Sequence, residues 1–377
     1  MKKIIFKNFL RETTQFFMLS TLAVTLIVWV IQAVNYMEFV TEDGHSFKIY
    51  FLYTIYSLPK IFNKLLPFMF FFSVFFNLIR YEEQNQTLIF WTNGIKKITF
   101  LKVLINYSFF FLILNFIFSL FIVPLSADKA RSYIRDSNVD YLPLLIKPKK
   151  FIDTVKKLTI YSDKKDENNL ENIIIKDSFS SSKSKIIFSK KGYFTQKNNE
   201  NFLILKNGKI LNINNGKTNI FNFNQTQINL SKYSSKSIKT PKLQEVKTTS
   251  LFDCLFFANK RILLDSGDRF KFNCNETNYL KNKITQELYT RIFKPFYIPL
   301  LALICGLLLI KSKNSQGFTK YKFKIFATGV VIISMSEISN KFYSLNLIQS
   351  IMILLIPFLL FVLFYYFFKK QSNLQIS

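Results

Sequence analysis

The chain has 377 residues, of which 49% are hydrophobic and 17% aromatic, and it carries a formal net charge of +28. An aromatic content this high is unusual in soluble proteins and ordinary in helices that face lipid, so the composition argues against a soluble enzyme. The charge alone would suit a nucleic-acid partner, but the lysines are spread over the whole chain together with many Asn and Ile. We interpret this as a compositional bias and expect no nucleic-acid partner.

Six apolar stretches are predicted to cross a membrane, three before about residue 126 and three after about residue 288. A helix needs about 20 mostly apolar residues to span a bilayer, and each stretch approaches this length with its flanks. The predicted divisions are residues 1–125, a polar insert with its connectors at 126–287, and residues 288–377. The spans centre on Thr21–Val34, Phe68–Ile79, Phe109–Leu125, Ile298–Ile310, Ile325–Ile338 and Ile348–Phe368.

The basic residues predict the orientation of these spans. The first apolar run continues through Trp29 to Tyr36 without a small-residue cleavage site, so we expect it to remain as a membrane anchor. Lys and Arg cluster at the amino end, between spans two and three, between spans four and five, and at the tail. With six alternating spans all four clusters share one side, which the positive-inside rule assigns to the cytoplasm. Both termini are then cytoplasmic and the insert lies outside.

The polar insert is rich in Lys, Asn and Ser and is predicted to form short strands. Two pairs within it, Asn207-Gly208 and Asn215-Gly216, favour tight hairpins between apolar runs. The spacing predicts an all-β domain, either a sandwich, a jelly roll or an open barrel. The expected strands are Lys157–Tyr161, Asn172–Ile175, Lys185–Phe188, Tyr193–Gln196, Phe202–Leu205, Lys209–Ile213 and Asn219–Leu230.

Residues suited to catalysis are scarce. His45 is the single histidine, which nearly excludes His-based catalysis and His-rich metal sites. Cys305 lies in an apolar span and is expected to be a small buried hydrophobe, whereas Cys254 and Cys274 either pair or stay free. The sequence contains no GxxxxGK[ST] phosphate loop, HExxH, GxSxG or kinase signature. We therefore expect no enzymatic site, metal or cofactor, and any ATP must be used by a separate subunit.

Lys60 and Lys64 stand four residues apart on one predicted helix face, between Pro59 and Pro67. Proline bends a helix and frees backbone groups that need other partners. The two lysines either snorkel to the outer interface or contact the phosphate groups of an anionic lipid that leaves the outer leaflet. The same two interpretations apply to the basic residues after the third span, Lys129, Arg131 and Arg135.

An amphipathic helix is predicted on the cytoplasmic side near residues 81–95. Glu82 and Glu83 would lie near its start, where carboxylates suit the helix dipole, and Gly94 would lie near its end. Its apolar side would be formed by Leu88, Ile89 and Trp91. A helix of this kind either lies on the membrane surface or docks into the groove of a partner.

Two ion pairs are predicted at helix spacing near the later spans. Glu287 and Arg291 stand at i,i+4 where span four begins, and we expect a structural pair of small net value. Glu337 and Lys341 repeat the spacing near the end of span five. An ionisable residue inside a span is a functional candidate, but Glu337 is close enough to the outer boundary that an interfacial role is the better interpretation.

The chain resembles the LptF/LptG family, the permease subunits of the bacterial lipopolysaccharide exporter, and is more similar to the LptF branch. The layout of three spans, an outer strand-rich domain and three further spans extends over the whole chain. The stretches that look like motifs of the family are Val28–Ala33, Gly44–Phe47, Leu58–Pro67, Trp91–Gly94, Phe151–Tyr161 and Glu287–Pro295.

This resemblance implies a multi-pass protein of the bacterial inner membrane with a periplasmic β-jellyroll-like domain. It also implies several partners: a second, LptG-like permease, a dimer of LptB-like ATPases, and jellyroll proteins similar to LptC and LptA. The two permeases would take lipopolysaccharide from the outer leaflet of the inner membrane. The β-domain would then hold its acyl chains in an apolar groove, since these chains need a continuous apolar path through water.

One departure from the family pattern concerns the cytoplasmic helix. The family usually has Ser-Glu-Leu at the head of this coupling helix, whereas this chain has Asn85-Gln86-Thr87. The carboxylate thought to meet the ATPase is therefore an amide, and Glu82 or Glu83, one turn earlier, would be its replacement. The coupling residues implied by the resemblance are Glu82, Glu83, Gln86, Leu88, Trp91 and Gly94.

Other classes of protein fit the sequence less well. A membrane-anchored sensor or scaffold with a ligand-binding β-domain is the main alternative, although no inner signalling domain is visible. A mechanical permease with four spans would carry its outer domain after the first span, and a lipid enzyme would need paired catalytic residues in its spans.

Overall fold

The computed structural model describes residues 2–374 apart from 42–45, 137–145, 156–157, 167–168, 181–182, 198–199, 215–216, 231–241, 257–261, 264–270, 273–277 and 344–346. Internal contacts divide the chain into two units, each of which is described by itself. The helical unit comprises Met1–Val30, Ser57–Asp128 and Pro241–Ser377, and the sheet unit comprises Ile31–Tyr56 and Lys129–Thr240.

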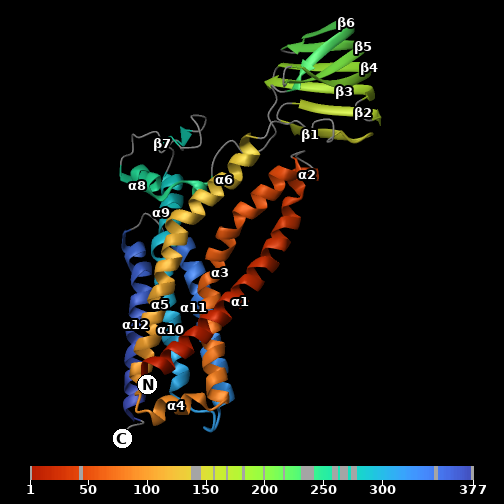
Figure 1. The fold of residues 1–377 in the computed structure, drawn as a ribbon. Helices are drawn as coiled ribbons and strands as arrows, with labels where there is room; N and C mark the ends of the chain where they lie inside the picture. Colours follow the sequence, from red (N-terminus) through yellow and green to blue (C-terminus); the bar gives the residue numbers. More distant parts are fainter. Residues whose placement is uncertain are drawn as a thin grey trace. The chain divides into compact units, whose positions relative to one another are not determined.

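Long helices form wherever the sequence is apolar in extended runs (Figure 1). In chain order the helices are α1 (Lys2–Tyr36), α2 (Glu38–Thr41), α3 (Phe47–Glu83), α4 (Gln86–Thr92), α5 (Lys97–Ile117), α6 (Val123–Asp136), α8 (Thr248–Phe256), α9 (Asn278–Ile292), α10 (Tyr297–Gly306), α11 (Phe318–Phe342) and α12 (Leu347–Leu374). The π-helical segment η1 (Phe118–Ile122) joins α5 to α6, and the 3-10 turn η4 (Lys294–Phe296) joins α9 to α10. A further 3-10 turn, η3 (Leu243–Glu245), precedes α8.

Five helical stretches among the described residues are long and apolar enough to cross a membrane: Lys3–Tyr36, Phe47–Glu83, Lys97–Ile134, Leu280–Leu309 and Gln349–Ser372. They coincide with five of the six predicted spans. The second is longer than expected, because α3 continues as a helix through both Pro59 and Pro67.

The remaining predicted span, the fifth in chain order, is helical but is not long and apolar enough to count as a membrane-spanning candidate. Its centre, Ile325–Ile338, lies within α11, which is not among the five membrane-spanning stretches. Lysines precede its apolar part, and Glu337 and Lys341 interrupt its far end, so the continuous apolar segment is short. The count of six spans therefore stays a prediction.

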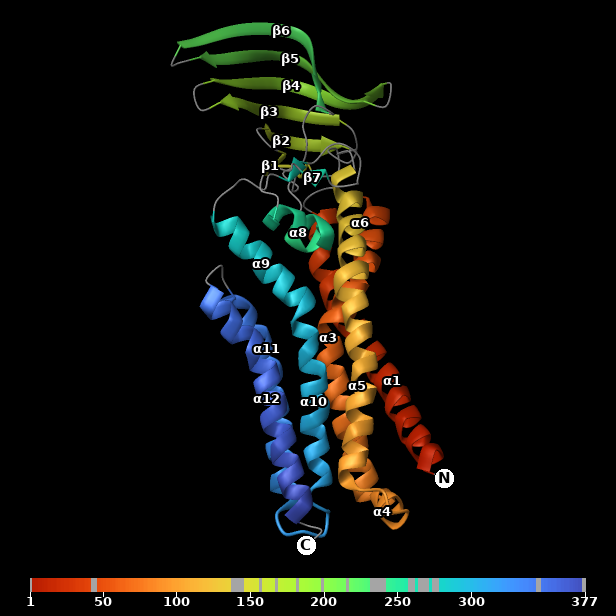
Figure 2. The same cartoon turned by 90° about the vertical axis from the view of Figure 1, so that its left-hand side faces the viewer.

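Helix α10 lies at the centre of the helical unit. All residues from Tyr297 to Leu309 are buried, and α10 packs against α5, α11 and α12 (Figure 2). Helix α11 also approaches α3 closely, because a Cβ atom at Gly329 would lie 2.1 Å from the Phe71 ring. Helices α3 and α5, which flank α4, are thus part of a continuous packed core.

Aromatic rings fill this core at the end of the unit where α4 lies. The Phe9 ring meets that of Phe100 edge to face at 5.2 Å, and Phe90 of α4 meets Phe100 at 4.8 Å. All three side chains are at most 1% exposed. Edge-to-face rings at this spacing stabilise a contact beyond their area alone, so α4 is anchored through Phe90.

The sheet unit contains one antiparallel sheet of six strands in sequence order, which confirms the predicted all-β insert. The strands are β1 (Phe151–Val155), β2 (Leu158–Asp166), β3 (Asn169–Ser180), β4 (Lys183–Lys197), β5 (Glu200–Asn214) and β6 (Lys217–Asn229). Each strand pairs with the next, so the described strands form a meander, whereas a jelly roll contains Greek-key connections. The jelly roll is therefore not confirmed. A short strand pair, β7 (Ile262–Leu263) with β8 (Lys271–Phe272), belongs to the helical unit.

The predicted Asn207-Gly208 hairpin is wrong, because these residues lie inside β5. The two strands expected on either side of them are one continuous strand, and the same holds for the two expected strands within β4. The Asn215-Gly216 turn falls outside the described residues, but Asn214 pairs with Lys217, as a hairpin between β5 and β6 requires.

A row of residues that the strand ladder skips crosses the sheet at the level of Asn207, and the register is the same on both sides of it. The strand ladder skips one residue on each of β2 to β6, and on β3 the buried residues Leu170 and Ile173 are three positions apart instead of two. Asn172 and Asn207 adopt left-handed backbone conformations with φ of 50° and 52°, which Asn tolerates better than most residues. The skipped residues are Asp163, Asn172, Lys190, Asn207 and Asn224.

Two buried serines complete the hydrogen bonding along this row. The Ser189 hydroxyl lies 2.8 Å from the carbonyl oxygens of both Lys191 and Lys206. The Ser162 hydroxyl lies 2.7 Å from the Lys164 carbonyl oxygen. A break in the ladder leaves main-chain groups in need of other partners, and the serine hydroxyls supply donors there.

Candidate functional site

The cytoplasmic helix predicted over residues 81–95 is divided into two parts by Asn85. Helix α3 ends at Glu83, and α4 begins at Gln86 after Asn85 turns left-handed with φ of 59°. Glu82 and Glu83 therefore lie at the C-terminal end of α3 and not at the start of the coupling helix, so the dipole argument for them is wrong. Gly94 does end this segment, with φ of +67° and its N–H donating to the Trp91 carbonyl at 3.0 Å.

Both glutamates bond to the link between α10 and α11. Glu82 accepts hydrogen bonds from the backbone N–H of Lys313 at 2.9 Å and from the Thr87 hydroxyl at 2.5 Å. The Glu83 carboxylate pairs with Lys322 at 3.1 Å, and its carbonyl accepts from the Lys313 ammonium at 3.0 Å. We call these four contacts the latch. It ties the end of α3 to α4 and to the start of α11.

Helix α4 presents apolar side chains outward. Leu88 is 54% and Ile89 50% exposed, whereas Phe90 on the opposite side is buried. Trp91 is half-buried against Phe90 and Phe100 and so contributes less to the outer surface than predicted. The Gln86 amide donates to the Gln84 side chain at 3.0 Å. An exposed apolar pair on a short anchored helix is a surface that a partner groove can cover.

The predicted headgroup lysines lie on the surface of α3. Lys60 and Lys64 are both exposed, four residues apart, as the spacing predicted. Within the described part of the chain neither forms an ion pair. Arg131 differs, because the residue is only 5% exposed and interacts with other groups. It is therefore not available to a lipid headgroup in this conformation, and the side chain of Arg135 lies outside the described part of the structure.

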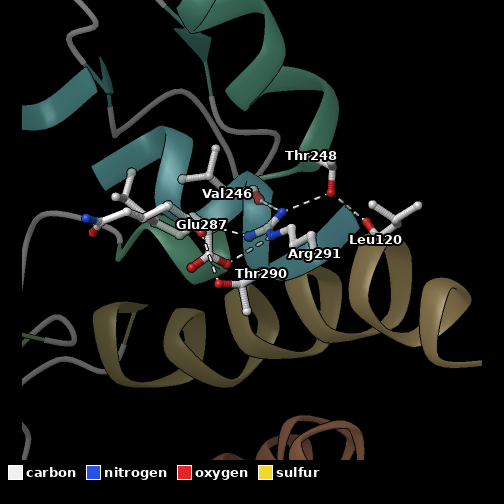
Figure 3. Close-up of polar contacts among 8 residues, drawn as sticks. Leu120, Val246, Thr248, Glu287, Thr290 and Arg291 are labelled. Carbon is white, nitrogen blue, oxygen red and sulfur yellow. Dashed lines mark hydrogen bonds and ion pairs between the residues drawn. The ribbon is translucent and has the colours of Figure 1, made fainter. Parts of the chain in front are cut away.

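The predicted pair of Glu287 and Arg291 is the centre of a larger network (Figure 3). Arg291 Nε donates to Glu287 Oε1 at 2.9 Å. Its Nη1 donates to the Val246 carbonyl and to the Thr248 hydroxyl, both at 2.9 Å, and its Nη2 donates to the Leu243 carbonyl at 3.0 Å. The Arg291 side chain is 3% exposed.

This network holds the returning connector onto the helices. Residues 243–248 lead back from the sheet unit, and the Thr248 hydroxyl donates in turn to the Leu120 carbonyl of η1 at 2.8 Å. Sequence reasoning found the ion pair from its local spacing but missed these partners, which come from distant parts of the chain. The expectation of a minor pair at a helix end does not fit a buried guanidinium with four bonds.

Cys254 of α8 is disulfide-bonded. The alternative that it stays free is thus excluded, and the cysteine suggested as its partner, Cys274, lies outside the described residues. Cys305 is free and fully buried in α10, as expected.

The two faces of the six-stranded sheet differ in character. Ile160, Ile175 and Ile187 are register partners on one face and are at most 2% exposed, because they pack with Leu203 and Leu205 into one cluster. On the opposite face lies a cavity of about 810 Å³. Its lining includes a row of register partners, Tyr161, Ile174, Phe188, Lys209 and Asn222, and the row of skipped residues, Asp163, Asn172, Lys190, Asn207 and Asn224.

Comparison with known proteins identifies relatives along nearly the whole chain. The family described as "Lipopolysaccharide export system permease LptF/LptG" matches residues 7–370. An uncharacterized protein of Rickettsia prowazekii (strain Madrid E) is 24% identical over 347 residues, which cover 90% of this chain and 91% of that protein.

Proposed function

Because this chain belongs to the LptF/LptG family of lipopolysaccharide export permeases, we propose that it extracts lipopolysaccharide from the inner membrane and passes it through its β-domain toward the outer membrane. In this proposal it works beside a second, LptG-like permease, and an LptB-like ATPase dimer in the cytoplasm supplies the energy. Periplasmic proteins similar to LptC and LptA would receive the lipid.

One combination of features carries the proposal: helices long and apolar enough to cross a membrane on both sides of an inserted six-stranded β-sheet, within a family match from residue 7 to residue 370. The disulfide at Cys254 supports an outer location for the segment between β6 and α9, since disulfides persist in oxidising compartments such as the periplasm. The basic clusters support cytoplasmic termini.

We call the proposed contact with the ATPase the drive contact. It is the exposed pair Leu88 and Ile89 on α4. The ATPase would cover this pair, and the latch would pass a displacement of α4 to α3 and α11. Because Glu82 and Glu83 already bond within the chain, they would act in this transmission. The direct ATPase contact would then rest on the apolar pair together with Gln86.

The proposed lipid path follows the apolar face of the sheet. Acyl chains leave water favourably only for another apolar surface, and the row of Ile160, Ile175 and Ile187 is such a surface. These side chains pack on one another in this structure, so we propose that the cluster must open for a lipid to pass.

Photo-crosslinking at paired positions tests this path. A photoreactive amino acid at Ile175 or Ile187 would face the apolar cluster, and at Ile174 or Phe188 it would face the opposite side of the same strands. We expect capture of lipopolysaccharide at Ile175 and Ile187, only with ATP and the partner subunits present. Capture that does not depend on ATP, or that occurs equally at Ile174 and Phe188, would contradict a driven conduit on this face and would favour a ligand-binding domain instead.

A further inference from the structure

A second cavity lies in the helical unit, at the end where α1 and α5 begin, and the proposed lipid path does not use it. Its volume is about 740 Å³. Its lining combines three lysines with mostly apolar residues, namely Lys3, Phe6, Lys7, Leu10, Gly94, Ile95, Lys96, Thr99 and Val103. Figures 1 and 2 show α1 and α5 beginning at the same end of this unit as α4.

The cavity is basic, and no acidic residue among the described ones pairs with its lysines. Its lining contains no acidic residue, and Lys3, Lys7 and Lys96 are exposed. In the parts of the chain that are described, none of the three forms an ion pair.

The acidic groups at the same end are already engaged. Glu12 of α1 accepts a hydrogen bond from the Asn8 amide at 2.9 Å. Glu82 and Glu83 bond within the latch. The three lysines are thus available to an anion from outside the chain.

The apolar part of the cavity is preformed. The Phe6 ring is held at 5.4 Å from both Phe90 and Phe100, and Ile95 is 5% exposed. Leu10 and Val103 are half-buried on the flanking helices. A ligand at this site therefore meets an apolar wall beside a group of ammonium ions, which suits a molecule that has both an anionic and an aliphatic part.

The position of the cavity indicates where such a molecule comes from. Both helices are membrane-spanning stretches, and these begin at Lys3 and Lys97, so the cavity lies where the chain passes from water into lipid. Lysine stems cover apolar surface while their ammonium groups stay in the headgroup region. Basic pockets between transmembrane helices on the cytoplasmic side are suited to anionic phospholipid headgroups.

We infer that this cavity binds one anionic phospholipid of the cytoplasmic leaflet. Its phosphate is held by Lys3, Lys7 and Lys96, and one acyl chain lies along Leu10 and Val103. The inference rests on the cytoplasmic orientation in the proposed function, but it does not depend on transport of lipopolysaccharide.

Native mass spectrometry of the full chain in detergent tests the site. The chain is titrated separately with phosphatidylglycerol, with phosphatidylcholine and with inorganic phosphate. We expect one saturable phosphatidylglycerol site. The variant that combines Lys3→Gln, Lys7→Gln and Lys96→Gln should bind this lipid at least tenfold more weakly, because each lysine contributes to the attraction. Val103→Phe keeps the charge, fills the apolar part, and should weaken binding as well.

The matched control combines Lys102→Gln, Lys369→Gln and Lys370→Gln, which removes the same charge from exposed lysines outside the cavity lining. It should bind phosphatidylglycerol within twofold of the unaltered chain. Equal binding of phosphatidylcholine, equal loss in the control, or full competition by inorganic phosphate would overturn the assignment. So would a cavity variant that binds the lipid normally but no longer co-purifies with the ATPase, since the cavity would then be a protein contact.

Discussion

Arg291 shows how one residue can join two separate parts of the chain. It is nearly fully buried and makes four hydrogen bonds, to an acid one turn earlier on its own helix and to groups of the returning connector. A guanidinium has five N–H donors in a fixed planar arrangement, which a lysine ammonium does not reproduce. The position therefore requires arginine.

Substitution of Arg291 should destabilise the helical unit strongly. Arg291→Ala leaves the Glu287 carboxylate and the carbonyls of Leu243 and Val246 without their donor, which costs about 3–5 kcal/mol. Arg291→Lys should cause an intermediate loss, because it keeps the charge but has fewer directed donors. Thermal denaturation of the purified chain in detergent measures both changes.

The ion pair of Lys294 with Glu337 provides the control for this experiment. The Glu337 side chain is 48% exposed and that of Lys294 is 15% exposed, so the pair is only partly buried and Lys294→Ala should cost about 1 kcal/mol, clearly less than Arg291→Ala. If Arg291→Ala melted at the same temperature as Lys294→Ala, the buried network would not have the role described here.

A separate prediction concerns the role of Lys60 and Lys64 in lipid capture. Both are exposed at i,i+4 on α3 and form no ion pair among the described residues, so an anionic lipid can approach them. The double variant Lys60→Gln, Lys64→Gln should reduce lipopolysaccharide capture by roughly thirtyfold if each lysine contributes about 1 kcal/mol. ATP-dependent release from vesicles containing the complete transporter measures this.

The charge-preserving variant Lys60→Arg, Lys64→Arg should keep most of that activity. Unchanged capture in the glutamine variant would instead favour the interpretation that both lysines only snorkel to the membrane boundary.

Sequence reasoning identified the site residues whose partners lie about one helical turn away in the chain. The pairs Lys60 with Lys64 and Glu287 with Arg291 follow from helix periodicity, which relates positions four apart. The latch partner Lys313 is 230 residues away from Glu83. No spacing rule relates such positions. The sequence therefore suggests Glu82 and Glu83 as contacts for the ATPase, whereas in the structure both carboxylates bond to groups inside the chain.

At the scale of elements, Asn-Gly is the local signal that proved ambiguous. The same left-handed backbone that closes a hairpin can also lie inside a long strand, at a residue that the strand ladder skips. Asn207 takes the second option, and a Cβ on Gly208 would lie 2.1 Å from the Phe188 carbonyl oxygen on the neighbouring strand. Whether such a pair turns the chain or bends a strand depends on the pairing of adjacent strands, which a single strand's sequence does not contain.

Helix α4 is seven residues long, and its stability comes from packing. Isolated helices of this length are not stable in water, so Phe90 and the latch must hold it in place. This leaves Leu88 and Ile89 free to serve a partner, since neither contributes to the core.

Polar substitution of that pair should weaken ATPase binding and leave the chain folded. Leu88→Ser with Ile89→Ser removes two half-exposed apolar side chains, and we expect at least tenfold less co-purified ATPase, corresponding to about 1.4 kcal/mol or more. Gln86→Glu restores the carboxylate common in the family and should increase the recovered ATPase. Thr92→Ala, also exposed on α4, is the control. Full ATPase recovery with the double serine variant would remove α4 from the proposed drive contact.

At the scale of the whole molecule, the fraction of buried residues differs strongly from helix to helix. In the most apolar segments of α1 and of α12, only 17% of the residues are buried, compared with 78% in the segment that spans α9 and α10. The exposed side chains of α1 include Leu19 at 73%, Leu22 at 63% and Val34 at 68%. Lipid can cover such apolar surfaces. A permease that works in a pair, however, must also present an apolar surface to the partner permease.

The chain should therefore co-purify with two other proteins, a second multi-span permease and a cytoplasmic ATPase. Partner binding stabilises the form that it binds, so the melting temperature in detergent should be higher for the assembly than for the chain expressed alone. The two contacts can be separated, because Leu88→Ser with Ile89→Ser should release the ATPase while the second permease stays bound. If the chain instead exported lipid in isolation, or if one variant released both partners together, the assembly proposed here would be wrong.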